Sequence, residues 1–229
     1  MASRSIMPVS LALVCAIMAI VAFTLWQARE DARTRAQREG ENIVHAIEAD
    51  VARNIEVYDL SLQGLREALA TVAVAHVERE VQRLALFDRA ASAKYMGALL
   101  VLNATGDIVI SSRSTAPPPI NLADRDYFQV HQSSPDIGLY ISRPFKGRLE
   151  RREDRIALSR RLPDKDGKFA GIVVGTLRLS YFRDLFSRLN VGQHGVITLA
   201  RSDGTILMRH PSIKGDYDIG GSFKGTPIF

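Results

Sequence analysis

The sequence Gly97-Ala-Leu-Leu-Val-Leu-Asn-Ala-Thr-Gly106-Asp-Ile108-Val109 returns later in the chain as Gly195-Val-Ile-Thr-Leu-Ala-Arg-Ser-Asp-Gly204-Thr-Ile206-Leu207. The opening glycines, the turn glycines and the isoleucine after each turn keep the same register. Strand-forming residues on both sides of a glycine turn predict a β-hairpin in each copy. Generic hairpins can match by chance, but the equal offsets favour two copies of one small module.

The segment between the two copies predicts both helices and strands. Pro117, Pro118 and Pro119 predict an irregular loop, and residues 124–132 predict a short helix with Asp124 as its candidate N-cap. Strands are predicted over 138–145, 155–162 and 169–179, and helices over 77–94 and 181–189. The Asp-Lys-Asp-Gly sequence at 164–167 predicts a tight turn between the last two strands. The pattern as a whole predicts an α+β fold.

Composition and charge narrow the class of protein. The 229 residues leave room for a long helix and one or two domains. The formal net charge is +5, and acidic residues are interspersed among the basic ones, which is typical of a solvated surface rather than of a nucleic-acid-binding face. The single cysteine, Cys15, excludes a disulfide framework or a cysteine-based metal site within one chain.

An apolar run extends from Val9 to Trp26 and is interrupted only by Ser10 and Thr24. It is close to the length of about 20 residues that crosses a bilayer as a helix, so it predicts a transmembrane span. A cleaved signal peptide is the alternative, disfavoured because the run is long and no A-x-A-like site follows it. More arginines follow the run than precede it, so the positive-inside rule would keep the C-terminal side in the cytoplasm. This rule weakens for long domains, which cross the membrane largely regardless of their charge. Charge alone therefore leaves the topology open.

Residues 27–75 predict a long helix that carries one apolar stripe. Its members recur at alternating steps of four and three residues: Val51, Ile55, Tyr58, Leu62, Leu65, Leu69 and Val72. This spacing suits a coiled-coil seam between two subunits, and equally a helix packed along its own domain. The charged and polar segment 29–41 predicts a solvated stalk.

Several short sequence words follow one another in order: Asp124-Arg125-Asp126-Tyr127-Phe128, Gly138-Leu139-Tyr140-Ile141-Ser142 with Pro144, Leu158-Ser159-Arg160-Arg161-Leu162, Asp166-Gly167-Lys168-Phe169-Ala170-Gly171 and Tyr181-Phe182. In order and spacing they resemble the double Cache family, the extracytoplasmic sensor regions of bacterial histidine kinases and diguanylate cyclases. The resemblance covers nearly the whole chain after the apolar run.

This resemblance implies an N-terminal anchor, a long helix, a membrane-distal PAS-like module that binds a small ligand, and a membrane-proximal module. The expected segments are 1–8 as a tail, 9–26 as the transmembrane helix, 27–95 as stalk and long helices, 96–189 as the distal module and 190–229 as the start of the proximal one. The second module is incomplete, so we expect a fragment of a receptor or a broken gene. The implied location is the inner membrane, with the sensor region in the periplasm.

The resemblance also implies a ligand site. Amino-acid-binding relatives carry a tyrosine, an arginine five residues on, an aromatic pair, a later strand tyrosine and an aspartate for the ligand ammonium. Ile120 stands at the leading tyrosine, and the strand that would carry the aspartate reads Gly175-Thr176-Leu177. The implied site residues are Arg125, Tyr127, Phe128, Tyr140 and Thr176, with His131 on the same helix face as the aromatic pair. Because no acid would hold an ammonium group, an organic acid is the expected ligand.

Structural roles for the same residues stay open. Asp124 and Asp126 flank Arg125, so a surface ion-pair cluster is as good an interpretation on sequence alone. The aromatic residues suit a hydrophobic core, and His131 can cap local backbone groups as well as line a pocket.

The arginine-rich stretch 143–161 fits a solvated hairpin that attracts anions better than a nucleic-acid groove, because no aromatic residue lies between Phe145 and Phe169. The histidines are scattered and no catalytic motif occurs, so we expect no catalytic residue, metal or cofactor in this chain. The expected partners are a small carboxylate ligand, the lipid bilayer and a second copy joined through the long helix, with no nucleic acid. A stand-alone anchored scaffold without a metabolite ligand is the alternative function.

Overall fold

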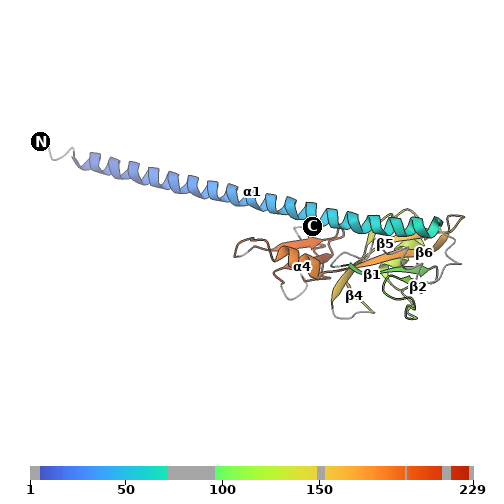
Figure 1. Ribbon diagram of the computed structural model, residues 1–229. Helices are drawn as coiled ribbons and strands as arrows, with labels where there is room; N and C mark the ends of the chain where they lie inside the picture. Colours follow the sequence, from blue (N-terminus) through green and yellow to red (C-terminus); the bar gives the residue numbers. More distant parts are fainter. Residues whose placement is uncertain (1–5, 72–95, 149–152, 194, 213–217, 227–229) are drawn as a thin grey trace. The chain divides into compact units, whose positions relative to one another are not determined.

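The computed structural model describes residues 6–71, 96–148, 153–193, 195–212 and 218–226 (Figure 1). The chain forms two compact units, Met1–Val51 and Ala52–Phe229, and the helix α1 (Ile6–Thr71) contributes to both. The helix that the sequence predicts over 77–94 lies outside the described residues.

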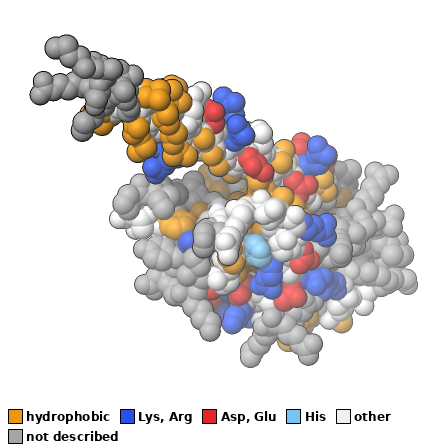
Figure 2. All heavy atoms as spheres, turned by 90° about the vertical axis from the view of Figure 1, so that its left-hand side faces the viewer, with side chains coloured by type: hydrophobic (Ala, Val, Ile, Leu, Met, Phe, Trp, Pro, Cys, Tyr) orange, Lys and Arg blue, Asp and Glu red, His pale blue; other side chains and the backbone are white. Residues whose placement is uncertain are grey.

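In the first unit, α1 exposes a continuous apolar surface. Leu11, Phe23 and Trp26 are 66%, 60% and 64% exposed. Figure 2 shows a group of apolar side chains, in orange, on the N-terminal part of the helix, followed by charged side chains. Among the described residues, one helix is long and apolar enough to cross a membrane, by length and composition, and it is α1. This finding agrees with the predicted span, because a lipid environment covers an apolar helix that has no protein around it.

The second unit is built on one antiparallel sheet in the order β2-β1-β6-β5-β3, with β4 also paired to β5. Its strands are β1 (Met96–Asn103), β2 (Ile108–Ser111), β3 (Tyr140–Ile141), β4 (Phe145–Lys146), β5 (Asp154–Pro163) and β6 (Phe169–Arg178). Gly167 has φ +78° in the turn between β5 and β6, a conformation that favours glycine. The α+β class and this turn are both as the sequence predicts.

One face of the sheet packs against the C-terminal part of α1. Tyr58, Leu62 and Leu65 of the apolar stripe are buried there, so these members pack within their own domain. Gly175 leaves room for the side chains packed on this face: a Cβ at this position would lie 2.8 Å from Leu99 Cδ2 and 3.8 Å from Leu62 Cδ2. Successive strand residues alternate between faces, which leaves the other side of β1, β5 and β6 for a second layer.

The other face packs against α3 (Asp126–Ser133) and the loop before it. The buried core on this side consists of Leu100, Leu102, Ile108, Leu122, Tyr127, Phe128, Ala157, Ile172 and Val174. Phe128 meets Phe169 edge to face, with ring centres 5.3 Å apart. The aromatic pair of the sequence therefore turns inward and fixes α3 to the sheet.

The second sequence copy also forms a hairpin, from β7 (Ile197–Ala200) and β8 (Ile206–His210), after α4 (Ser180–Phe186). Its turn repeats the first in detail. The turn glycines Gly106 and Gly204 have φ +88° and +84°. Their carbonyls accept hydrogen bonds from Leu122 N (2.8 Å) and Phe223 N (3.0 Å), respectively. The repeat is thus structural, and it extends beyond the hairpin to the segment that follows it.

Two local predictions are wrong. Asp124 is not the N-cap of α3: Arg125 holds that position, the helix begins at Asp126, and the Asp124 carboxylate instead accepts two hydrogen bonds from Arg148. The strand predicted over 138–145 is divided into β3 and β4. Pro144 lies between them and has no N–H to donate to a ladder.

Candidate functional site

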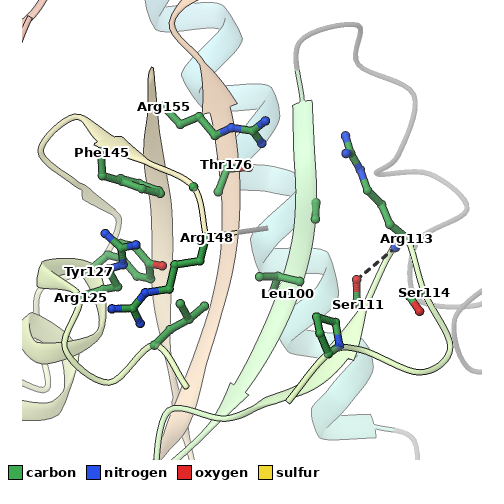
Figure 3. Close-up of a pocket in the computed structure, with 14 residues that line it drawn as sticks. Leu100, Ser111, Arg113, Ser114, Arg125, Tyr127, Phe145, Arg148, Arg155 and Thr176 are labelled. Carbon is green, nitrogen blue, oxygen red and sulfur yellow. Dashed lines mark hydrogen bonds between the residues drawn. The ribbon is translucent and has the colours of Figure 1, made fainter. Parts of the chain in front are cut away.

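A cavity of about 230 Å³ opens on the sheet face that carries α3 (Figure 3). Its walls come from β1, β2, β5, β6, the loop before α3, the start of α3 and the segment around β4. The lining residues are Ala98, Leu100, Ser111, Arg113, Ser114, Pro118, Leu122, Arg125, Tyr127, Phe145, Gly147, Arg148, Arg155 and Thr176. The volume and the mixed lining suit a small molecule with an apolar part and a polar group.

The lining carries four arginines: Arg113, Arg125, Arg148 and Arg155. None of the 14 lining residues that Figure 3 draws is acidic. Arg155 is only 6% exposed. A cavity whose charged side chains are all guanidinium groups favours an anion over a cation.

Arg125 stands at the N-cap of α3 in an extended backbone conformation (φ −79°, ψ 142°). Its guanidinium carbon lies 5.1 Å from the centre of the Phe145 ring, and its NH2 makes one long contact of 3.5 Å with the carbonyl of Lys146. Its buried Nε has no hydrogen-bond partner in the described part of the chain. The ring contact holds the group in place, and the guanidinium keeps donors for a bidentate anion.

Arg148 has a different role, because a carboxylate already balances its charge. Its NH1 and NH2 donate to Oδ1 and Oδ2 of Asp124 at 3.0 and 2.7 Å, and NH1 also donates to the carbonyl of Asn121 at 2.7 Å. This pair holds the pKa of Asp124 below its usual range. Arg148 therefore joins the β4 side of the cavity to the loop before α3.

Asp126, at the start of α3, also links α3 to the segment that contains β3 and β4. Its carboxylate accepts from the backbone N–H of Tyr127 (2.8 Å), from the backbone N–H of Arg143 (2.9 Å) and from the hydroxyl of Tyr140 (3.2 Å). Of the ion pairs among the described residues, none joins Arg125 to Asp124 or Asp126. Asp124 thus pairs with Arg148, and Asp126 accepts from two backbone N–H groups and Tyr140, so both aspartates support the walls of the cavity.

The structure brings three of the expected site residues to the cavity: Arg125, Tyr127 and Thr176. Tyr127 is 3% exposed, and burial raises the pKa of its phenol to about 12, so it lines the site as a neutral group. Its ring lies 5.6 Å from that of Phe145, centre to centre. The Oγ1 of Thr176 is buried and has no hydrogen-bond partner among the described residues.

The other three lie beside the cavity. Phe128 is fully buried in the core below it. His131 is also fully buried; its Nε2 lies 3.0 Å from Ser159 Oγ, and burial lowers the pKa of the imidazole. Tyr140 packs its ring against that of His131, with centres 6.3 Å apart. These residues shape the wall rather than line it.

Arg148, Arg155 and Phe145 line the cavity although sequence reasoning did not select them. Strand alternation could have placed Arg155 on the α3 face, because Ala157 and Ser159 of the same strand are buried on that side. The pairing of Arg148 with Asp124 had no such signal, since it depends on how a loop folds back.

The chain was compared with known proteins. The family model described as Cache domain matches residues 28–224. No curated protein matches the chain. Among solved structures, the extracellular domain of rpHK1S-Z16, a protein assigned as a histidine kinase, is 26% identical with a TM-score of 0.52, over 77% of this chain and 76% of that chain. The family resemblance carried by the sequence words is thereby confirmed.

Two chemoreceptors share the fold at lower identity. The ligand-binding domain of the amino acid chemoreceptor PctB from Pseudomonas aeruginosa PAO1, in complex with L-arginine, is 18% identical with a TM-score of 0.55, over 76% of this chain and 68% of that chain. That of the chemoreceptor CtaA from Pseudomonas fluorescens, in complex with L-isoleucine, is 18% identical with a TM-score of 0.51, over 71% and 62%. This chain spans less than two thirds of the CtaA structure. An extracellular ligand-binding receptor from Desulfohalobium retbaense is 20% identical with a TM-score of 0.55, and the match covers 31% of that receptor's chain.

Proposed function

The chain belongs to the Cache domain family, and from this premise we propose that it is the ligand-binding region of a membrane-anchored sensor whose ligand is a small organic acid. The observation that carries the ligand class is the cavity lining: besides Arg148, whose charge Asp124 balances, it has three arginines and, among the residues described there, no acidic side chain. A carboxylate would bind Arg125 through two parallel N–H···O bonds and lay its apolar part on Tyr127 and Phe145.

An α-amino acid fits this lining poorly. The names of the PctB and CtaA structures record amino acid ligands, which are zwitterions and need a counter-charge for the ammonium group as well as for the carboxylate. On β6, where the family pattern would supply an aspartate, this chain has Thr176. An ammonium group beside the arginines would be desolvated next to like charges, which is costly.

The setting of the sensor is also a proposal. The apolar part of α1 anchors the chain in the inner membrane, and the Cache region lies in the periplasm. The signal passes to a cytoplasmic output, a histidine kinase or a diguanylate cyclase. The sensor region itself performs no catalysis, and it acts as a dimer joined through the long helix.

Thermal unfolding tests the ligand class. Small organic acids should raise the melting temperature of the full chain in detergent micelles, because a ligand that binds only the folded state stabilises it. L-isoleucine and L-arginine should leave it unchanged. Arg125→Ala should abolish the shift, whereas Arg188→Ala, which removes an exposed arginine after α4, should keep it. Stabilisation by the amino acids alone would overturn the ligand class, and a shift that survives in Arg125→Ala would overturn the site.

A further inference from the structure

We propose that the cavity has a second anion-binding end, formed by Arg155 and Thr176, and that its ligand is a dicarboxylate rather than a monocarboxylate. This inference rests on the proposed function, since it concerns the same cavity. Beyond the ligand class, it specifies how many carboxylates the ligand carries and where each one binds.

The position of Arg155 follows from strand register. On β5, Arg155 pairs with Phe145 of β4, while the ring of Phe145 contacts Arg125 and Tyr127. Phe145 is therefore a neighbour of both arginines. Figure 3 shows Arg125 and Tyr127 on one side of the pocket, and Arg155 with Thr176 on another. The two guanidinium groups thus belong to different sides of the cavity, so we assign a separate carboxylate to each.

Thr176 completes the Arg155 end of the cavity. It pairs with Ala157 across β5 and β6, so Arg155, two residues before Ala157, is its diagonal neighbour on the same face. In Figure 3 the long side chain of Arg155 extends past Thr176 toward β1. The Thr176 Oγ1 is buried, and no hydrogen-bond partner for it occurs in the described ranges. A carboxylate at this end would accept from this hydroxyl as well as from the guanidinium.

Glycine at position 97 creates the space for this hydroxyl. A Cβ built on Gly97 would lie 1.8 Å from Thr176 Oγ1, so any side chain there would displace the threonine. Ala98, the next residue of β1, lines the cavity beside it. The sequence motif that opens the first repeat thus also shapes the second end of the cavity.

The cavity also offers apolar surface. Leu100, Tyr127 and Phe145 are among its lining residues and carry no charged atom. A ligand with a short hydrocarbon chain and two carboxylates matches a lining that combines apolar side chains with arginines at two places. A monocarboxylate of the same length would place a methyl group against a guanidinium and a hydroxyl, and would lose the charge-assisted hydrogen bonds there.

Paired ligands test the proposal on the full chain in detergent micelles. Butanoate and butanedioate differ only at one end, and so do pentanoate and pentanedioate. By titration calorimetry, a dicarboxylate of at least one length should bind at least about tenfold more tightly than its monocarboxylate, as expected for one added charge-assisted contact. Arg155→Leu should reduce dicarboxylate affinity to the monocarboxylate level and leave monocarboxylate affinity unchanged.

Two further variants guard against a folding defect. Arg155→Lys keeps the charge and should retain part of the preference for two carboxylates, and Thr176→Val should weaken only the dicarboxylate, by a smaller factor. Equal affinity for the monocarboxylate and the dicarboxylate of each pair would overturn the proposal of a second anion-binding end. So would an equal loss of affinity for both acids in Arg155→Leu and Thr176→Val. Either result would leave the proposed sensor of organic acids standing. Binding of neither acid overturns both proposals. Inorganic phosphate binding in place of the acids would do the same.

Discussion

The guanidinium of Arg201, in the turn of the second hairpin, lies 5.2 Å from the centre of the Tyr140 ring. The hydroxyl of the same tyrosine donates to Asp126, the residue between the cavity residues Arg125 and Tyr127. A weaker ion pair of 3.6 Å, largely exposed, joins Arg143 to Asp203 next to it. Tyr140 therefore connects the start of α3, at the cavity, to the turn of the second module.

We expect Arg201→Ala to loosen the second hairpin without disturbing the first sheet. The substitution removes a cation–π contact of roughly 0.5–1 kcal/mol. Hydrogen exchange should quicken in β7 and β8 and stay unchanged in β1, β5 and β6. Arg183→Ala, which removes an exposed arginine of α4, is the matched control. Unchanged exchange in β7 and β8 would mean that the contact between Arg201 and Tyr140 does not stabilise the second hairpin.

The pair between Asp59 of α1 and Arg160 of β5 should stabilise the second unit. Arg160 NH2 donates to Asp59 Oδ2 at 2.7 Å, Nε donates to Oδ1, and both side chains are 17% exposed. Asp59→Ala should lower the free energy of unfolding by about 1–3 kcal/mol, because it leaves a largely buried guanidinium without its carboxylate. Glu56→Ala, an exposed acid of the same helix, should change it by less than about 0.5 kcal/mol.

The repeat and the sheet were predictable because local chemistry determines them. A glycine at positive φ in each turn and the alternation of strand residues do not depend on distant contacts. Loop-mediated pairs were not predictable in this way. Asp124 reads as a helix cap in the sequence, yet its partner Arg148 lies in another segment, beyond β3 and β4. The same limit hid Arg148 in a hairpin expected to be solvated, whereas the place of Arg155 on β5 could have been inferred from strand alternation.

Gly106 should tolerate alanine poorly, for two separable reasons. Its φ of +88° disfavours a side chain, and a Cβ there would lie 2.7 Å from both Cβ and N of Ala123. Gly138 also has positive φ (+67°), but no atom lies within 4 Å of a Cβ built there. Gly138→Ala should cost about 1 kcal/mol and Gly106→Ala about 1–2 kcal/mol more, measured by thermal unfolding. Equal costs would show that the turn moves to make room.

The buried imidazole of His131 should make stability depend on pH. Burial lowers its pKa in the folded state, and Arg160 and Arg161 nearby act in the same direction. The unfolded chain binds a proton near pH 6.5 and the folded chain only at lower pH, so stability should fall as the pH drops below about 6.5 and level off below the folded pKa. His131→Gln should flatten this part of the pH profile of the melting temperature. An unchanged profile would show that another group sets it.

The last prediction concerns topology, where two arguments conflict. The arginines after the apolar run favour a cytoplasmic location for the domain, whereas membership of a family with extracellular sensor domains favours export. Long domains cross the membrane largely regardless of charge, so the family argument should win. Alkaline phosphatase fused after Leu189 should be active, and a green fluorescent protein at the same position should be dark. An expressed but inactive phosphatase together with a fluorescent partner fusion would place the cavity in the cytoplasm, where it would meet metabolites of the cell rather than those of its surroundings.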